Sequence, residues 1–289
     1  MRIFITGATG FVGSAVVQEL LTNGHSVIGL ARSEASAAAL KRAGAGVHRG
    51  SLVDLDSLKR GASEADGIIH CAFDHDFSNF AANASIDQAA IEALGSALVG
   101  SDRPLVVTGG TVGLAPGRLL TEEDVGSSSI PRKSQEAALA LAARGVRASV
   151  VRLSPSVHGD GDHGMVPLLV KSAREKGFAT YVGAGDNRWS AVHRLDAARL
   201  FRLVLERADP GTVVHAVGDE GDPMRSIAEV IGRVLRLPVQ AVPEETFGFL
   251  GNVFALDQPS SSAWTREKFD WRPTHPSLLA DLEAGNYPA

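Results

Sequence analysis

The first thirteen residues, MRIFITGATGFVG, constrain the fold of this chain most strongly. A short apolar run, 3–5, passes directly into a turn that contains Gly7, Gly10 and Gly13. The stretch 13–21 then has the apolar spacing of a helix that opens on these glycines. Glycine permits a tight turn and a close approach of the backbone, and a helix N-terminus presents free N–H groups at a positive dipole end. The pattern therefore predicts a phosphate-binding loop between a first strand and a first helix.

The same alternation of strand and helix continues through the first half of the chain. Strands are expected at 2–6, 26–30, 47–49, 67–71, 105–108 and 148–153, with helices at 35–43, 54–61, 83–99 and 131–144. The strand segments are apolar throughout instead of alternating, which is typical of parallel strands buried on both faces. The chain is therefore predicted to be α/β, with a doubly wound parallel Rossmann sheet.

The regular alternation of strand and helix becomes less clear beyond residue 153. A glycine-rich stretch, 158–164, precedes predicted helices near 166–176, 223–235 and 243–256. We expect residues 1–155 to form a dinucleotide-binding Rossmann domain. Residues 156–289 are expected to form mainly a smaller C-terminal lobe for the substrate, with segments near 190–217 returning to the sheet.

Charge and cysteine content exclude several classes of protein. The 289 residues include 28 Lys and Arg against 33 Asp and Glu, a net charge of −5, so no basic surplus indicates nucleic acid or an anionic membrane as partner. The single cysteine excludes an internal disulfide and favours a reducing compartment. No apolar run is long enough to cross a membrane or to serve as a secretory leader. We expect a cytoplasmic protein that acts on a small-molecule substrate.

Four segments together resemble the extended short-chain dehydrogenase/reductase superfamily, which includes the NAD(P)-dependent epimerases and dehydratases. They read TGATGFVG at 6–13, IIHCA at 68–72, VVRLSPSVHG at 150–159 and VHRLDAARL at 192–200. The resemblance covers nearly the whole chain. It implies a bound nicotinamide dinucleotide and a C-terminal lobe that closes over the substrate.

The end of the second strand indicates which dinucleotide is preferred. Ala31 stands where members of the superfamily that use NAD carry Asp, and Arg32 and Ser33 follow it. A guanidinium suits a ribose 2′-phosphate through charge-assisted bonds, and a serine hydroxyl adds a donor. These residues predict NADP(H). The alternative is that Arg32 is a solvated loop charge and Glu34 binds the ribose.

The resemblance implies further cofactor contacts at the ends of later strands. Ser51 departs from the Asp that the superfamily usually has beside the adenine, whereas Leu52 keeps the apolar residue that follows it. Cys71 reads as a small packing residue and not as a nucleophile. The expected cofactor-binding residues are Gly7, Thr9, Gly10, Phe11, Val12, Gly13, Arg32, Ser33, Ser51, Leu52, Cys71, Ala72, Phe73, Thr108, Pro155 and Val157.

The catalytic residues depart from the superfamily's pattern. Its reductases use a Ser or Thr after the fifth strand and a Tyr-x-x-x-Lys on the next helix, where the tyrosine exchanges a proton and the lysine lowers its pKa. The segment 126–136 contains no tyrosine. Arg132 aligns with the lysine and Ser128 with the tyrosine, and a slip of one residue gives Lys133 and Ser129.

Other protic groups are candidates to replace the tyrosine. Thr111 matches the Ser or Thr after the fifth strand, with Thr108 as the alternative. His75, His158 and His163 follow strands whose ends approach the expected site, and an imidazole titrates near neutrality. Tyr181 is a further candidate. The expected catalytic set is Thr111, Arg132 and His158.

No metal site is expected, because Asp74, His75 and Asp76 are adjacent and rarely chelate one ion without distant ligands. The sequence predicts an NADP(H)-dependent oxidoreductase that transfers hydride to or from a small carbonyl or alcohol. One alternative is an NADP(H)-binding sensor without turnover, and a third is a sugar-nucleotide epimerase or dehydratase. The Ala-rich faces of 83–99 and 131–144 are compatible with a homodimer.

Overall fold

The computed structural model describes residues 1–126, 131–285 and 287. Ser128 and Ser129 therefore lie outside the described residues. Contacts divide the chain into two compact units. The first comprises residues 1–109, 126–152 and 197–214, and the second comprises 110–125, 153–196 and 215–289. Each unit is described by itself below.

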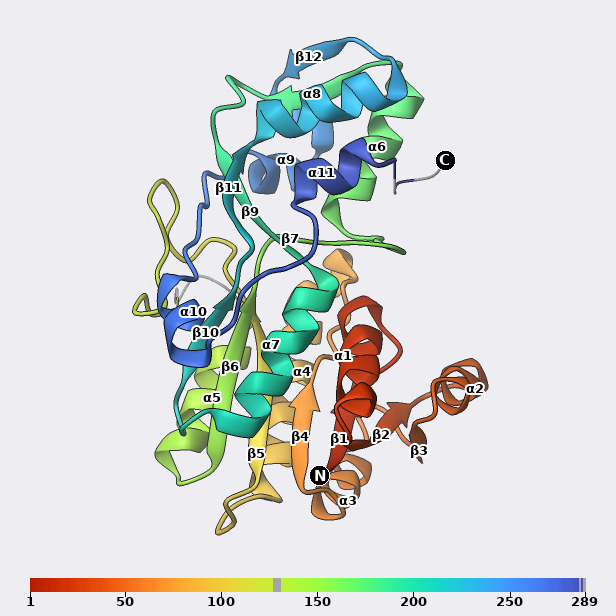
Figure 1. The fold of residues 1–289 in the computed structure, drawn as a ribbon, viewed down its shortest axis with the longest axis vertical. Coiled ribbons are helices and arrows are strands. Elements are labelled where there is room, and N and C mark those ends of the chain that lie inside the picture. The colour runs from red at the N-terminus through yellow and green to blue at the C-terminus, as the bar shows by residue number, and fades with distance from the viewer. Residues whose placement is uncertain (127–130, 286, 288–289) are drawn as a thin grey trace. The chain divides into compact units, whose positions relative to one another are not determined.

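The first unit is built on a seven-stranded sheet with the order β10-β6-β5-β4-β1-β2-β3 (Figure 1). The strands are β1 (Arg2–Thr6), β2 (Ser26–Ala31), β3 (Gly46–Arg49), β4 (Gly67–His70), β5 (Pro104–Gly110), β6 (Arg147–Leu153) and β10 (Val213–Ala216). The pairings of β1 with β2 and β4, of β2 with β3 and of β4 with β5 are all parallel. The doubly wound α/β fold predicted from the sequence is confirmed.

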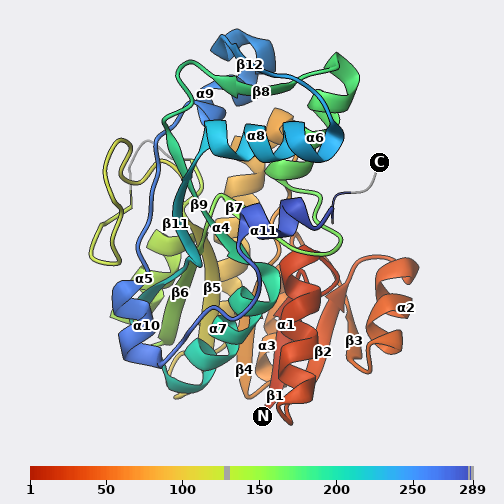
Figure 2. The same cartoon turned by 45° about the horizontal axis from the view of Figure 1, so that its top comes forward.

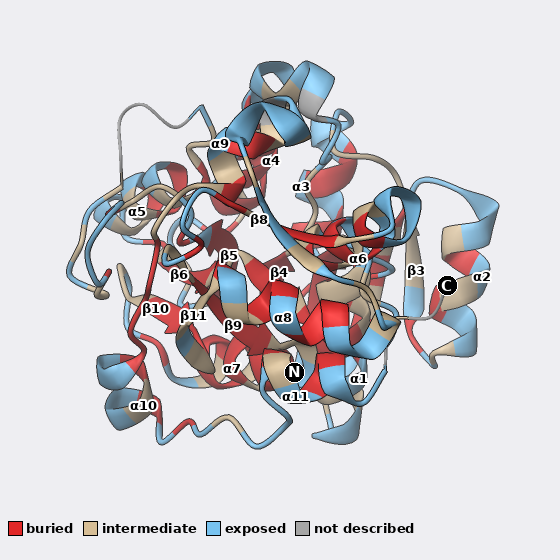
Figure 3. Cartoon of the chain, turned by 90° about the horizontal axis from the view of Figure 1, so that it is seen from above, coloured by how far each residue is buried: buried red, intermediate tan, exposed pale blue. Residues whose placement is uncertain are grey.

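Helices cover both faces of this sheet. They are α1 (Phe11–Thr22), α2 (Glu34–Arg42), α3 (Leu55–Ser63), α4 (Phe80–Ser96), α5 (Ser134–Ala143) and α7 (Arg194–Arg207), of which the first three residues of α7 belong to the second unit. In Figure 2, α1 and α7 lie in front of the sheet and α3, α4 and α5 lie behind it. Phe4, Ile91 and Leu141 are fully or almost fully buried between the sheet and the rear helices. Figure 3 shows the same burial along β4 and β5.

The second unit contains two small sheets and several helices. β11 (Asp219–Pro223), β9 (Arg188–His193) and β7 (Ser156–His158) form one sheet, and β12 (Val239–Val242) pairs with β8 (Ala179–Val182) in the other. The helices are α6 (Met165–Lys176), α8 (Met224–Leu235), α9 (Phe249–Phe254), α10 (Ala263–Phe269) and α11 (Leu278–Glu283). Trp189 stacks on Phe254 in the core of this unit, with ring centroids 5.5 Å apart.

Two predicted helices differ from the structure. The single helix expected at 243–256 is a 3-10 turn, Glu244–Phe247, followed by α9, because Gly248 between them adopts φ +55° and interrupts the helical backbone. The helix expected at 131–144 begins only at Ser134, so Arg132 precedes it. No helix in the described ranges is long and apolar enough to cross a membrane.

Candidate functional site

The glycine loop joins β1 to α1 in a turn that leaves no space for a side chain at Gly7 or Gly13. Gly10 donates a backbone hydrogen bond of 2.9 Å to the Gly7 carbonyl. Gly7 has φ +69°, and a Cβ on it would lie 2.6 Å from the Ala72 nitrogen. A Cβ on Gly13 would lie 2.1 Å from the Gly7 oxygen. The three glycines therefore allow the loop to pack against α1 and against the end of β4.

The loop has the properties of a phosphate site. Thr9 and Gly10 are exposed, and Phe11 and Val12 are half-buried. Gly10 is the N-cap of α1 and offers no side chain to hydrogen bond the first turn. A helix N-terminus without a side-chain cap presents N–H groups and a positive dipole end to an anion. The residues present thus fit the pyrophosphate of a dinucleotide.

Cations gather where β2 and β3 end. Arg32 is exposed, and the Ser33 hydroxyl caps α2 by accepting from the Ser36 N–H at 3.1 Å. Arg49, at the end of β3, donates to the Ser33 carbonyl at 3.0 Å and forms an ion pair with Glu34. Arg49 was missed by the sequence analysis because it lies 16 residues beyond Ser33 and no local pattern connects the two. Ser51 and Leu52 follow β3 and are half-buried.

The ends of β4 and β5 lie beside each other in the sheet. The Thr108 hydroxyl donates to the His70 carbonyl at 2.8 Å. Burial raises the pKa of the Cys71 thiol to about 12, so the thiol stays protonated and unreactive at neutral pH. Ala72 and Phe73 follow and are half-buried, and the guanidinium of Arg132 lies 4.1 Å from the centre of the Phe73 ring.

A chain of hydrogen bonds connects the ends of β1 and β4 with α4 and with the start of α5. His70 Nδ1 lies 2.8 Å from the Thr6 hydroxyl, and His70 Nε2 lies 3.0 Å from Asp87 Oδ1. The Ser134 hydroxyl donates to Asp87 Oδ2 at 2.5 Å. Arg132 donates to Ser134 Oγ at 2.8 Å, and its Nε is 3.7 Å from Asp87. We call Thr6, His70, Asp87, Arg132 and Ser134 the Asp87 cluster.

The Asp87 cluster holds a charged carboxylate in the interior. Burial raises the pKa of Asp87, but the hydrogen bond from His70 and the charges of His70 and Arg132 together lower it by more. The pKa of Asp87 therefore lies below its usual range. Arg132 is also fixed by donating to the Thr108 carbonyl at 3.1 Å. The cluster therefore fixes the Arg132 guanidinium at the carboxyl edge of β5.

The remaining expected site residues belong to the second unit. Thr111 is buried, and its amide and hydroxyl both donate to the Leu153 carbonyl, at 3.0 and 3.3 Å. His158 is fully buried with Nδ1 3.0 Å from Asp281, and its Nε2 has no hydrogen-bond partner among the described residues. Pro155 and Val157 beside it are half-buried.

The other candidates for proton transfer occupy separate positions. His163 is exposed, with Nδ1 3.3 Å from the Gly161 carbonyl. Tyr181, on β8, lies under the Arg225 guanidinium at 5.1 Å. His75 contacts the Phe73 ring edge-on at 5.1 Å, in the first unit.

Sequence reasoning overlooked His70, Asp87 and Ser134. One signal for the first two was present. His70 ends an otherwise apolar strand, and Asp87 is an acidic residue in a helix whose neighbours at 84, 90, 91 and 94 are apolar. A charged residue on a buried face requires a partner.

Comparisons with known proteins give consistent results. Residues 3–99 match the NAD dependent epimerase/dehydratase family. An uncharacterised protein of Schizosaccharomyces pombe is 47% identical, covering 99% of this chain and 100% of its own. A 2-alkyl-3-oxoalkanoate reductase of Stenotrophomonas maltophilia is 29% identical over 81% of this chain and 75% of its own. A dTDP-glucose 4,6-dehydratase from Streptomyces venezuelae, solved with NAD and TYD bound, has a TM-score of 0.81 at 21% identity, covering 99% of this chain and 96% of its own.

Proposed function

The chain belongs to the extended short-chain dehydrogenase/reductase superfamily, and on this premise we propose that it is an NADP(H)-dependent oxidoreductase acting on a small carbonyl or alcohol. Its glycine loop fits a pyrophosphate, and the family matched by residues 3–99 is NAD dependent. The similarity to a 2-alkyl-3-oxoalkanoate reductase supports reduction of a carbonyl.

The preference for the phosphorylated cofactor rests on one observation. Glu34, the acidic residue nearest the end of β2, is paired with Arg49. In a site that prefers NAD, an acidic residue accepts hydrogen bonds from the ribose hydroxyls. Glu34 already faces a cation. Arg32 is exposed and supplies one guanidinium beside Ser33 for a 2′-phosphate. Arg49 supplies a second, because its pair with Glu34 is exposed to solvent and a bound phosphate would compete with that carboxylate.

In the proposed reaction, each part of the chain has a defined task. The bound nicotinamide supplies or accepts the hydride. The glycine loop holds the pyrophosphate, and Arg132 donates hydrogen bonds to the nicotinamide ribose or to a substrate oxygen. The sequence predicts that Thr111 orients the substrate oxygen and that His158 exchanges the proton, but both are buried in the second unit, so neither is assigned a contact with the substrate. Asp87 keeps Arg132 in place without touching the substrate.

A second candidate is an NADP(H)-binding sensor without turnover. One observation favours it: both tyrosines of the chain, Tyr181 and Tyr287, belong to the second unit and are engaged there. Tyr181 lies under Arg225, and the Tyr287 hydroxyl donates to Asp162 at 3.2 Å. No phenol of the described first unit stands near Arg132 to act as the acid.

Turnover assays with Arg132 variants separate the two candidates. The protein is incubated with NADPH and a panel of ketones, aldehydes and 3-oxo acids, and loss of the reduced-nicotinamide absorbance is followed. We expect turnover that Arg132→Lys partly keeps and that Arg132→Met reduces at least about 100-fold, the effect of losing a positioned charged donor. Arg144→Met, at the exposed end of α5, is the matched control. Tight NADPH binding with no turnover on any carbonyl would establish the sensor instead.

A further inference from the structure

Three potential metal ligands meet in the second unit. His193 is the last residue of β9, Asp196 lies in the first turn of α7, and His275 lies between α10 and α11. One ligand atom from each lies within 4.8 Å of those of the other two. All three residues line a pocket of about 230 Å³, and His275 is exposed at its rim. The cluster is therefore accessible from solvent.

The carboxylate of this group is fixed before any ion arrives. Asp196 is almost fully buried and accepts from the backbone N–H groups of Thr274 and His275, both at 3.0 Å. In metal sites, ligating carboxylates are themselves held by such hydrogen bonds. An ionised carboxylate has about four acceptor positions, and Oδ2 receives only the His275 N–H among the described residues. One oxygen therefore has capacity for a further ligand.

One nitrogen of each imidazole lies within 4.8 Å of a carboxylate oxygen of Asp196. His275 Nδ1 lies 2.9 Å from Asp196 Oδ1. His193 Nδ1 accepts from the Leu195 N–H at 3.3 Å, so it carries a lone pair and no proton. The rings stack with their centroids 4.6 Å apart and their planes at 9°. Rotation about the soft second side-chain torsion of histidine lets both nitrogens turn to one point.

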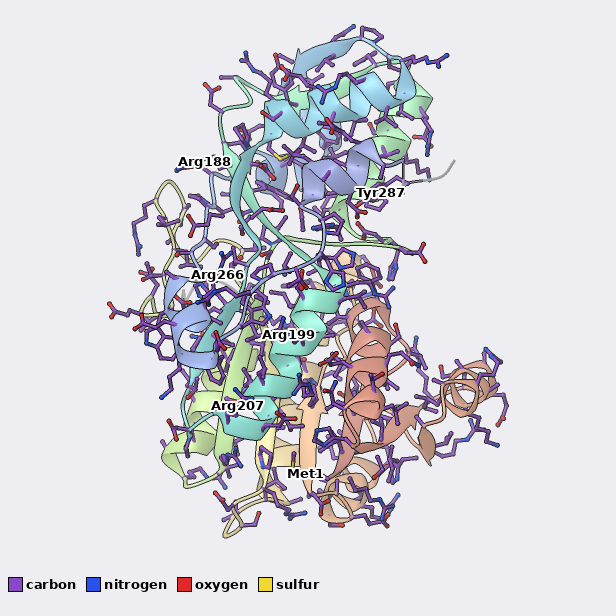
Figure 4. The ribbon with its side chains drawn as sticks, viewed as in Figure 1. Met1, Arg188, Arg199, Arg207, Arg266 and Tyr287 are labelled. Atoms are coloured by element: carbon purple, nitrogen blue, oxygen red, sulfur yellow. The ribbon has the colours of Figure 1, made fainter. Side chains whose placement is uncertain are left out.

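The charges that line the pocket are compatible with a cation. Asp219 adds a second carboxylate, although its Oδ2 already accepts from the Leu278 N–H at 2.9 Å. Arg266, labelled in Figure 4, is the opposing charge. Its guanidinium is engaged by the Ser262 hydroxyl at 2.9 Å and by the Gly218 carbonyl at 2.9 Å. The pocket is thus lined by two carboxylates and by one guanidinium that is already hydrogen-bonded to other groups.

We propose that His193, Asp196 and His275 bind a divalent transition-metal ion, with Zn²⁺ as the expected one. Two imidazoles and a carboxylate are a common zinc ligand set, and the pocket leaves a further coordination position open for water or a small ligand. Zinc-bound nitrogen and oxygen atoms lie about 2.0–2.1 Å from the ion, so tetrahedral ligands are about 3.3 Å apart. The distance from His275 Nδ1 to Asp196 Oδ1 is already close to this value. The ligand atoms of the three residues lie up to 4.8 Å apart, so the longest of these separations must shorten by about 1.5 Å.

The ion would link two distant parts of the second unit. It would replace the proton that His275 and Asp196 share, and join the end of β9 to the segment that precedes α11. The sequence analysis considered only Asp74, His75 and Asp76 as metal ligands, and it did not connect Asp196 with His275, which lies 79 residues further on. The proposal is independent of the oxidoreductase assignment.

Zinc titration of the full chain tests the proposal. Chelator-treated protein is titrated with Zn²⁺ by calorimetry, and Co²⁺ is used as a spectroscopic probe. We expect one ion per chain, a d–d absorption band typical of nitrogen and oxygen ligands, and no competition by Mg²⁺, which prefers oxygen ligands. His193→Gln and His275→Gln should each weaken Zn²⁺ binding at least tenfold. His163→Gln, at an exposed histidine of the same unit, is the matched control.

Two results would overturn the proposal. One is the absence of saturable Zn²⁺ binding by the folded wild-type protein. The other is equal affinity in wild type, His193→Gln and His275→Gln, which would show that the ion binds elsewhere. Far-ultraviolet circular dichroism confirms that each variant is folded, and two separate histidine variants keep the test valid if one of them is not.

Discussion

Asp87 on α4 accepts a hydrogen bond from His70 Nε2 on β4 at 3.0 Å, and both side chains are shielded from solvent. The same carboxylate also faces Ser134 and Arg132. The interior of the first unit thus contains an ion pair that is linked directly to the carboxyl edge of the sheet. Stability and function should both depend on it.

Removing the Asp87 carboxylate should strongly destabilise the protein. Asp87→Ala leaves the Arg132 charge uncompensated and two donors unpaired, so the free energy of unfolding should fall by about 3–5 kcal/mol. Asp87→Asn keeps an acceptor and should lose less. Urea denaturation measures both, with Asp102→Asn, an exposed residue of the same unit, as control. A loss below about 1 kcal/mol in Asp87→Ala would contradict the described role.

A methyl group in the glycine loop should abolish nucleotide binding. The Cβ of Gly13→Ala would lie 2.1 Å from the Gly7 oxygen, which is part of the backbone and has no side-chain freedom to move away. We expect NADPH binding too weak to measure and a lower melting temperature. Gly110→Ala is the matched control, because its Cβ would lie 3.9 Å from the nearest atom. Normal NADPH affinity in Gly13→Ala would show that the loop does not bind the nucleotide.

Asp222 should make stability depend on pH. Burial and then the neighbouring Asp219 raise its pKa from 3.8 to about 6, and its Oδ2 has no partner among the described residues. Because the pKa is higher in the folded protein, the unfolded chain loses this proton first as the pH rises. The free energy of unfolding is therefore lowered by this group. The loss of stability is absent below about pH 4, grows between pH 4 and 6 and is constant above.

Asp222→Asn removes this loss of stability. The variant should be more stable than wild type by about 1–2 kcal/mol at pH 7.5, a value reduced from the full shift because the carboxyl is partly exposed. The difference should vanish as the pH falls toward 4. Denaturant titrations at several pH values measure it, with the exposed Asp186→Asn as control. A difference that is the same at every pH would refute the assignment.

Arg49 should contribute to cofactor preference. If it contacts the 2′-phosphate, Arg49→Met should weaken NADPH binding about 5- to 30-fold, the usual effect of one charge-assisted hydrogen bond, and leave NADH binding unchanged. Arg60→Met, on the exposed face of α3, should change neither affinity. Equal weakening of NADPH and NADH would assign Arg49 a structural role only.

The sheet and its flanking helices were predictable because their signals are local. Uninterrupted apolar runs such as GIIH and LVVT predict buried parallel strands, and these segments form β4 and part of β5. Helix limits were less predictable, since they depend on caps and on single backbone conformations. The chain enters α4 through a 3-10 turn that Asp76 caps, three residues earlier than expected.

The candidate site was predictable only where its residues are contiguous. The glycine loop is one short contiguous motif that indicates a phosphate site by its spacing, and Arg32 was predicted from the superfamily's pattern at the end of the second strand. The Asp87 cluster and Arg49 depend on contacts between elements that are far apart in sequence, for example the 47 residues between Asp87 and Ser134. No spacing rule covers such contacts, and only the fold brings these side chains together.

The most direct test of the account is the affinity of the protein for four nucleotides. Dissociation constants for NADPH, NADP⁺, NADH and NAD⁺ are measured by calorimetry on protein stripped of nucleotide, for wild type and for Arg32→Glu. We predict that wild type binds NADPH at least tenfold tighter than NADH, a difference of about 1.4 kcal/mol, and that Arg32→Glu loses the preference. Equal affinities for NADPH and NADH, or unchanged NADPH affinity in Arg32→Glu, would contradict it.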